Sequence, residues 1–226
     1  LLCTTVFTLA ITTASFADIY QYADCDENGT LLLTELDAEP EVYLSELYLG
    51  CADLTSANLT EANLSYANLI DANLTGANLN DAILTEANLS FANLYGANLN
   101  FANLYGANLA AANLKEAKMV YANLYGANLS FADLNNAVLT YANLNGANLL
   151  AADMAYANLN GANLNDAILT NADLTGANLS GANLSGADNW ESATWSSATY
   201  NDATVFPECM NPEKYGMIYD SGIVNG

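Results

Sequence analysis

A short acidic stretch near the start of the chain has the residues and spacing of a calcium-binding loop. Oxygen-bearing side chains recur at every second position, a glycine follows the third of them, and a glutamate closes the set. Calcium is bound by such short oxygen ligands together with a backbone carbonyl and a distal bidentate carboxylate, and glycine permits the sharp turn between them. The predicted metal ligands are Asp24, Asp26, Asn28, Thr30 and Glu35.

Other residues of this stretch argue against calcium. Leu32 offers no oxygen at the ninth position of the loop, and Pro40 shortens the helix that would follow it. The sequence contains no second loop of this kind to pair with the first. Two interpretations therefore stay open: a calcium-binding loop that stabilises an N-terminal cap, or an acidic turn at which the cap begins.

The rest of the composition offers little for catalysis. The chain has no histidine, 3 lysine or arginine residues in total and 25 acidic residues, which gives a net charge of −22. It has no evident nucleophile–base pair and no phosphate-binding loop, so we expect no enzyme and no certain cofactor besides the calcium considered above. The charge repels nucleic acid and anionic lipid and attracts basic partners, although solubility alone also explains it.

The element that must position every other group is a five-residue repeat. Alanine recurs at every fifth position from Ala52 to Ala187, usually followed by asparagine or aspartate and then by leucine. A period of five fits neither a helix, with 3.6 residues per turn, nor a flat strand, whose faces alternate every two residues. A fixed short period indicates a solenoid, in which each unit buries its apolar side chains by stacking on its neighbours. Met119 and Met154 replace leucine conservatively.

These units, such as Ala52-Asp-Leu-Thr-Ser and Ala57-Asn-Leu-Thr-Glu, resemble the pentapeptide repeat family over residues 52–206. The resemblance implies an all-β fold, a right-handed quadrilateral β-helix of about seven to eight coils with a cap at each end. In such a helix each pentapeptide forms one side of a square coil, with leucine and alanine inside and the other three positions in water. We expect asparagine to form the tight corners and to stack in ladders between coils.

The ends of the chain divide it further. Residues 1–17 are apolar and uncharged and end in the small-x-small site Ser15-Phe16-Ala17, which predicts a signal peptide and a secreted or periplasmic protein without membrane insertion. Residues 18–51 are predicted as an N-terminal cap, 52–206 as the β-helix and 207–226 as a C-terminal tail.

The two caps have competing interpretations. Leu47 to Cys51 keep the five-residue register, whereas a short helix from Glu41 to Leu49 is the alternative. At the far end, aromatic residues are expected to replace small surface residues and to form a cap, and the family resemblance offers a homodimer interface as the alternative. Two prolines then end the array, and residues after about Tyr215 are expected to be loose. The aromatic residues and prolines concerned are Trp190, Trp195, Tyr200, Phe206, Pro207 and Pro212.

Export would permit disulfide bonds. Cys25 and Cys51 precede the repeats, while Cys209 follows them at the opposite end of a rod too long for a disulfide to span. We therefore predict a Cys25–Cys51 disulfide and an unpaired Cys209, with fully reduced cysteines as the alternative.

Aromatic residues recur at intervals of twenty in the middle of the repeats. Residues twenty apart lie one above another in a square coil, so these side chains form a surface patch. Such a patch can stack on sugar rings or anchor a partner protein, or it can simply stiffen the rod. The patch consists of Phe101, Tyr121 and Tyr141 in one column and Tyr105 and Tyr125 in a second.

Taken together, the residues predict an exported, non-catalytic structural module that contacts an unknown protein or glycan, with calcium stabilising its N-terminal cap. The alternative is an acidic DNA mimic that binds a DNA-handling enzyme such as gyrase, as one branch of the resembled family does. That alternative requires a protein that is not exported, because gyrase is cytosolic.

Overall fold

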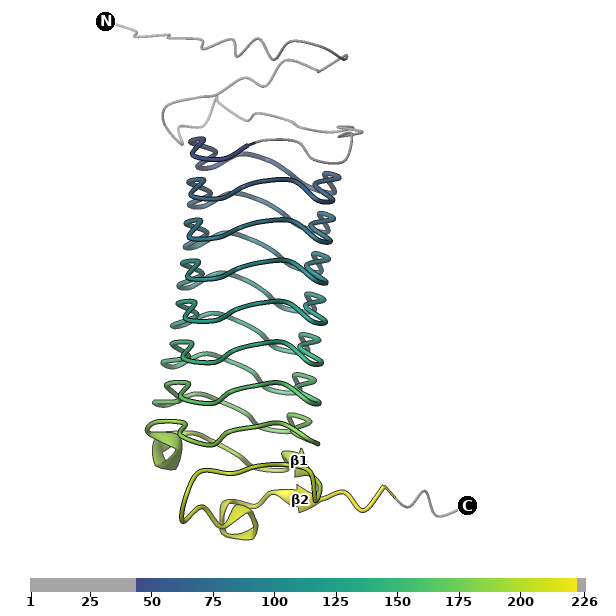
Figure 1. The fold of residues 1–226 in the computed structure, drawn as a ribbon, viewed down its shortest axis with the longest axis vertical. Coiled ribbons are helices and arrows are strands. Elements are labelled where there is room, and N and C mark those ends of the chain that lie inside the picture. Colours follow the sequence, from purple (N-terminus) through teal and green to yellow (C-terminus); the bar gives the residue numbers. More distant parts are fainter. Residues whose placement is uncertain (1–43, 223–226) are drawn as a thin grey trace, which may run out of the picture.

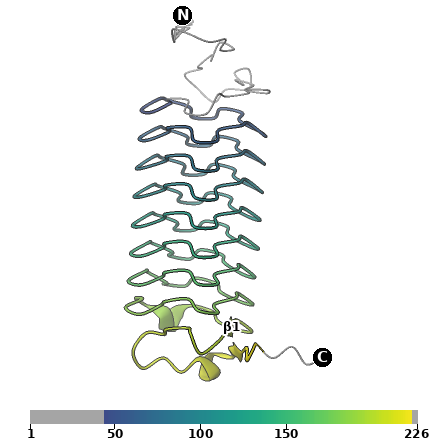
Figure 2. The same ribbon diagram turned by 45° about the vertical axis from the view of Figure 1, so that its right-hand side comes forward.

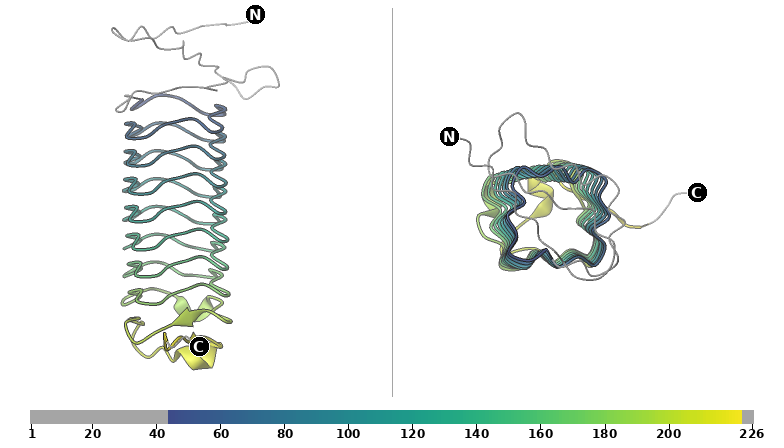
Figure 3. Two further views of the ribbon diagram at one scale, coloured as in Figure 1. Left: turned by 90° about the vertical axis from the view of Figure 1, so that its right-hand side faces the viewer. Right: turned by 90° about the horizontal axis from the view of Figure 1, so that it is seen from above.

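The computed structural model describes residues 44–222, which form a rod of stacked, nearly flat coils (Figure 1). Turned about its long axis, the rod shows coils of the same outline stacked one on another (Figure 2), and viewed from above the coils superpose as a square (Figure 3). The predicted signal peptide, calcium loop and Cys25 lie outside the described residues, so these remain predictions.

Backbone hydrogen bonds between residues twenty apart hold the coils together. From Tyr48 to Ile168, every residue at the asparagine position forms a parallel bridge with the residue twenty further along the chain. In one such pair, Leu54 donates its N–H to the carbonyl of Asn73 at 2.7 Å, and Asn73 donates to Ala52 at 2.8 Å. Each side of a coil is therefore paired, like a short parallel strand, with the corresponding sides of the coils before and after it.

The interior of the rod contains the alanine and leucine side chains, as predicted. Nearly all of them, from Ala57 to Leu184, are completely or almost completely buried, and Met119 and Met154 are buried at leucine positions. Alternation of a small with a large apolar side chain suits close packing in a narrow square interior. Burial of these side chains is the main source of the stability of the fold.

The corners of the square are formed by the two variable residues after each leucine. Ala57 donates its N–H to the carbonyl of Leu54 at 3.0 Å, which closes a turn over Thr55 and Ser56. We call these the first and second corner positions. The second has a left-handed backbone throughout, with a φ of 57° at Ser56, as the third residue of a type II turn requires.

Asn136 and Asn171 occupy second corner positions, but the asparagine that follows each alanine does not form the corners, and that part of the prediction was wrong. It lies at the bridged centre of each side, half-buried, where its amide serves two partners. The Oδ1 of Asn143 accepts the N–H of Asn145 at 3.2 Å, which fixes the entry to the corner. The Nδ2 of Asn143 donates to Asn123 at 3.1 Å, so the predicted ladders between coils are present.

The coiled structure begins before the first alanine repeat. Leu44 and Leu49 are buried at the leucine position, and Leu44 donates its N–H to the carbonyl of Asn63 at 2.7 Å. Residues 44–49 are thus part of a coil, and the alternative helix up to Leu49 is wrong for them.

At the C-terminal end the register shifts by one residue. Asp173 bridges to Thr194, twenty-one residues further on, so Trp195 occupies a leucine position and is buried. A further shift pairs Asn183 with Val205, and Phe206 then follows at the leucine position. The prediction that these aromatic residues replace small surface residues was therefore wrong for Trp195 and Phe206, which close the interior instead.

The chain then continues past the prolines into an ordered end. The 3₁₀ helix η1 (Trp190–Ser192) and the strand β1 (Thr199–Tyr200) are followed by the 3₁₀ helix η2 (Pro212–Tyr215) and the strand β2 (Ile218–Tyr219). Strand β2 pairs in parallel with β1 and places Met217 in the core. The expectation that residues after Tyr215 are loose was wrong for the residues up to 222.

Two further findings concern the cysteines and the membrane. Cys51 is disulfide-bonded, and Cys209 is free and exposed, as predicted. The pairing of Cys51 with Cys25 involves a residue outside the described range and stays a prediction. Among residues 44–222, none of the helices has the length and apolar character to span a bilayer.

Candidate interaction surface

The predicted aromatic patch forms two columns of stacked rings. The ring centroids of Phe101 and Tyr121 lie 5.5 Å apart, and those of Tyr121 and Tyr141 lie 5.1 Å apart. The rings of Tyr105 and Tyr125 are parallel within 1° at 5.5 Å. Each of the five side chains remains about half exposed. The structure thus brings the predicted residues together, as two columns along the rod.

The longer column occupies backbone positions that disfavour large side chains. Phe101, Tyr121 and Tyr141 all lie at the second corner position, with φ between 56° and 60°. A residue with a Cβ costs roughly 1–2 kcal/mol in this left-handed region, and glycine avoids that cost. The repeat accepts glycine at this position, as Gly126 and Gly146 show. Aromatic residues therefore occupy it at some expense in stability.

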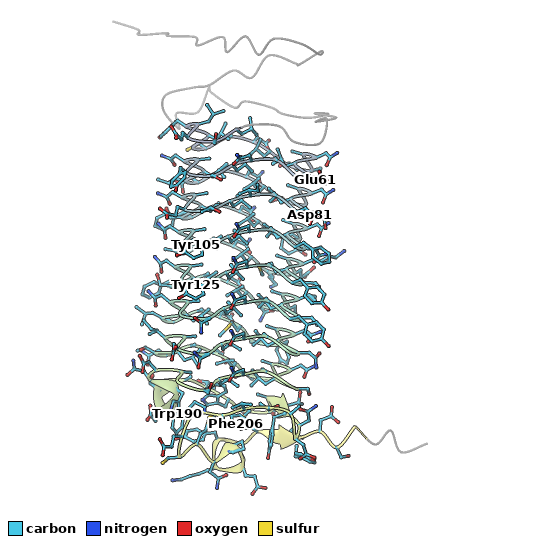
Figure 4. All side chains as sticks on the ribbon, viewed as in Figure 1. Glu61, Asp81, Tyr105, Tyr125, Trp190 and Phe206 are labelled. Carbon is cyan, nitrogen blue, oxygen red and sulfur yellow. The ribbon has the colours of Figure 1, made fainter. Side chains whose placement is uncertain are left out.

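A flat side of the rod separates the two columns. We call it the asparagine face, because it carries Asn103, Asn123 and Asn143 at its bridged positions. Asn123 donates its Nδ2 to Asn103 at 3.1 Å, and the same bond recurs between Asn143 and Asn123. Rings at both edges and amides between them give this face an apolar rim and a polar floor. Figure 4 shows Tyr105 and Tyr125 along one edge of the rod.

Charge is distributed unevenly along the rod, a feature that was not predicted from the sequence. Residues 44–86 contain six carboxylates and residues 133–188 contain five, whereas residues 87–132 contain only Glu116 together with Lys115 and Lys118. The same middle segment carries most of the exposed aromatic side chains of the coils. These are four of the five predicted residues, all but Tyr141, together with Phe91, Tyr95 and Phe131. A count of charges per coil would have revealed the segment.

One ionisable group of the middle segment has a shifted pKa. The Tyr95 hydroxyl donates a hydrogen bond to Glu116, and this bond, with the nearby negative charge, raises the pKa of Tyr95 above its ordinary value. Neutral tyrosine is favoured there. Within the described part of the chain, no group of three or more histidine, cysteine or acidic residues is arranged to hold a metal ion. The chemistry of this surface is therefore that of contact between rings, amides and hydroxyls.

The comparisons with known proteins agree with this architecture. The model of pentapeptide repeats matches eight copies, in segments spanning residues 41–130 and 132–188. No curated protein sequence matches the chain.

Solved structures give several likenesses. The chain is 37% identical to HetL, a pentapeptide repeat protein involved in heterocyst differentiation regulation from the cyanobacterium Nostoc sp. strain PCC 7120, over 72% of this chain and 78% of that one, with a TM-score of 0.32. It is 34% identical to a pentapeptide repeat protein of the Arabidopsis thaliana thylakoid lumen over 41% of this chain and 68% of that one, with a TM-score of 0.34.

A third likeness concerns the fold alone. A trypsin-treated form of QnrB1, a plasmid-mediated fluoroquinolone resistance protein, superposes with a TM-score of 0.60 at 18% identity, covering 80% of this chain and 84% of that one. Pentapeptide repeat proteins form right-handed quadrilateral β-helices and are generally structural or interaction modules. On the matched repeats and their square coils, this chain belongs to the pentapeptide repeat family.

Proposed function

We propose that this chain is an exported, non-catalytic rod of about seven to eight coils that binds a partner protein through its middle segment. The observation that carries the proposal is the combination found at residues 87–132: exposed aromatic side chains are concentrated where carboxylates are nearly absent, in a chain of net charge −22. Enrichment in aromatic residues and depletion of charge distinguish the centre of a protein interface from the rest of a surface.

The backbone strain at the longer column supports the same proposal. Stacking of the rings stabilises each pair by only about 0.5–1.5 kcal/mol, which roughly offsets the left-handed backbone of each aromatic residue. Stiffening of the rod alone therefore gives little reason to prefer aromatic residues to glycine at these corners.

The stacking geometry favours a protein over a glycan. A sugar ring packs against an open aromatic face, but Tyr121 has Phe101 on one face and Tyr141 on the other. The columns offer mainly ring edges and phenolic hydroxyls to a partner. Such groups suit a protein interface, in which tyrosine combines apolar contact with a hydrogen bond.

The alternative of DNA mimicry is less well supported. Residues 44–188 carry twelve acidic and two basic side chains, a net charge of −10. At 20 residues per coil and about 4.8 Å per coil, that rod is about 35 Å long, and a duplex of equal length presents roughly twenty charges. The middle segment also interrupts the acidic surface, whereas the phosphates of a DNA duplex form a continuous row of negative charges.

The proposal can be tested with immobilised protein and two matched variants. The double variant Tyr121→Ser, Tyr125→Ser removes one ring from each column, and Tyr156→Ser removes an exposed ring from another corner. Serine is acceptable at both corner positions, since Ser56 occupies the second and Ser65 the first. Circular dichroism would confirm that both variants fold.

We expect the double variant to lose the proteins that the unmodified rod retains from an extract or medium of the source organism, and Tyr156→Ser to keep them. Equal retention by all three proteins would refute the proposal. If the unmodified rod and Tyr156→Ser bind a glycan on an array and the double variant does not, the partner is a sugar and not a protein.

A further inference from the structure

Side chains at the second corner position lie over the residue twenty positions further along the chain. A Cβ added to Gly161 would collide with the ring of Tyr141, and one added to Gly176 would collide with the ring of Tyr156. Acidic side chains follow the same rule, because a Cβ at Gly106 would lie 3.2 Å from the Cγ of Glu86. Each such side chain therefore leans one coil toward the C-terminal end.

This rule places a carboxylate beside the first residue of each aromatic column. Asp81 precedes Phe101 by twenty residues in the same corner column, and Figure 4 shows Glu61 and Asp81 one above the other along that edge. Glu86 lies over Gly106, directly beside Tyr105, and donates its N–H to the carbonyl of Tyr105 at 2.8 Å. One edge of the asparagine face thus carries Asp81 one coil above Phe101, and the other carries Glu86 beside Tyr105.

The ring faces next to these carboxylates are the open ends of the columns. Phe101 stacks on Tyr121 and Tyr105 stacks on Tyr125, in both cases on the C-terminal side. Toward the N-terminal end, the residues one coil away from these two rings are Asp81 and Thr85. Neither end ring therefore has another ring on its outer side: Asp81 precedes Phe101, and Thr85, the chain neighbour of Glu86, precedes Tyr105.

A carboxylate beside an aromatic face is an arrangement that a cation would stabilise. The ring face carries negative charge density, so the two groups repel each other weakly. An ammonium or guanidinium group between them would gain a cation–π contact and an ion pair together. The two lysines of the middle segment, Lys115 and Lys118, lie on other sides of the rod.

We propose that the asparagine face binds an extended segment of the partner protein through two basic side chains, one at each carboxylate–ring pair. Phe101 and Tyr105 are four residues apart, which limits their Cα separation to about 14 Å. Two basic residues at positions i and i+4 of an extended segment span the same distance and project from the same face. The intervening residues of that segment would lie over the amide of Asn103. This inference rests on the proposed function and specifies the partner.

A fluorescent peptide with the sequence Arg-Ser-Thr-Ser-Arg is the probe. Its controls are the same peptide with citrulline in place of arginine, which keeps the shape and loses the charge, and a peptide whose arginines are three residues apart. Binding would be measured by fluorescence anisotropy at two salt concentrations, because exposed ion pairs weaken with salt. We expect the first peptide to bind more tightly than both controls.

The protein variants separate the two pairs from the general acidity of the rod. Asp81→Asn and Glu86→Gln should each weaken binding about two- to fivefold, and together about tenfold. Phe101→Gly should weaken it about two- to fivefold while relieving backbone strain. Asp71→Asn is the matched control: Asp71 occupies the same position above Phe91 at a corner away from the asparagine face, and its loss should change binding less than about twofold.

Three results would overturn the inference: equal binding of the charged and citrulline peptides, equal binding of the two arginine spacings, or equal effects of Asp81→Asn and Asp71→Asn. Failure of this inference can be distinguished from failure of the proposed function. Suppose that the Tyr121→Ser, Tyr125→Ser variant no longer retains the partner, but that peptide binding is unchanged by substitution of Asp81 and Glu86. The aromatic columns would then still be the interaction surface, and the inference that the partner binds through a basic segment would be wrong. If instead the variant retains the partner and peptide binding depends on Asp81 and Glu86, the rod has a peptide site but does not bind the partner through its aromatic columns.

Discussion

The middle of the rod and its C-terminal end use aromatic residues in opposite ways. In the middle segment, Phe101 and Tyr121 stand at corners and point into solvent. At the end, Trp195 lies at a leucine position and is 1% exposed. A single additional residue between Ala187 and Ala193 makes the difference, because it moves the following side chains from corner positions to core positions. The position of a residue within the five-residue register therefore decides its role more than its chemical type.

The largest expected effect is that of Trp195→Ala. The Trp195 side chain fills the end of the interior, and its Nε1 donates to the carbonyl of Trp190 at 3.0 Å. Truncation leaves a cavity and should cost about 3–5 kcal/mol. Stability in repeat proteins is local, so hydrogen exchange should show the loss at the amides of Leu174 and Leu179.

Trp195→Leu restores the residue type of the other coils and should cost less than Trp195→Ala, since it fills part of the cavity. Unchanged exchange at Leu174 in the alanine variant would contradict the assignment of Trp195 to the core of the cap.

A pair of glycine substitutions tests the lean of the corner side chains. Gly161→Ala should cost about 1.5–3 kcal/mol, because the added Cβ takes a left-handed backbone and displaces the ring of Tyr141 from its stack. Gly126→Ala has open space around its Cβ and should cost only about 1 kcal/mol. Urea unfolding followed by circular dichroism measures both, and equal costs would show that the ring moves away freely.

The asparagine ladder should contribute modestly to stability. Asn143→Ala removes the bonds to Asn123 and Asn163 and the bond that holds the N–H of Asn145. Because these groups are half-exposed and water can replace the lost partners, we expect a cost of about 0.5–1.5 kcal/mol in urea unfolding. Asn143→Val should cost less, since Val138 occupies the same position on another side and suits extended backbone. A valine variant less stable than the alanine variant would contradict this.

The sequence predicted the repeat, its core and the ladders because a period of five with invariant alanine admits one arrangement of inward side chains. The sequence did not predict which residues form the corners. Whether asparagine or the two variable residues turn the chain depends on backbone angles, which the repeat pattern does not specify. Trp195 was placed on the surface although Ala193 and Ala198 already marked the new register, in which it stands two residues after an alanine. The aromatic columns followed from residues spaced by twenty, but the lean that sets Asp81 against Phe101 is a property of the three-dimensional corner.

The smallest expected effect is that of a tyrosine–carboxylate hydrogen bond, of which each of the two regions has one. The Tyr219 hydroxyl donates to the carboxylate of Asp202 at 2.8 Å, and this bond, more than any other cause, raises the pKa of Tyr219 above 10.0, its value in an unfolded chain. Tyr95 at Glu116 is its counterpart in the middle segment. In each pair the neutral phenol is favoured by folding, because a phenolate cannot donate and is repelled by the carboxylate.

A group whose pKa is raised on folding contributes its stability fully below the unfolded pKa and loses it as the pH rises through the folded pKa. The difference in thermal midpoint between the unmodified protein and Tyr219→Phe should therefore be constant below pH 10 and shrink above it. Tyr95→Phe should show the same dependence with its effect in the middle coils, while Tyr156→Phe serves as the control. A difference that grows with alkaline pH would mean that the carboxylate does not hold the phenol neutral. Because both tyrosine side chains are exposed to solvent, water competes for these bonds, and the expected effect is therefore the smallest.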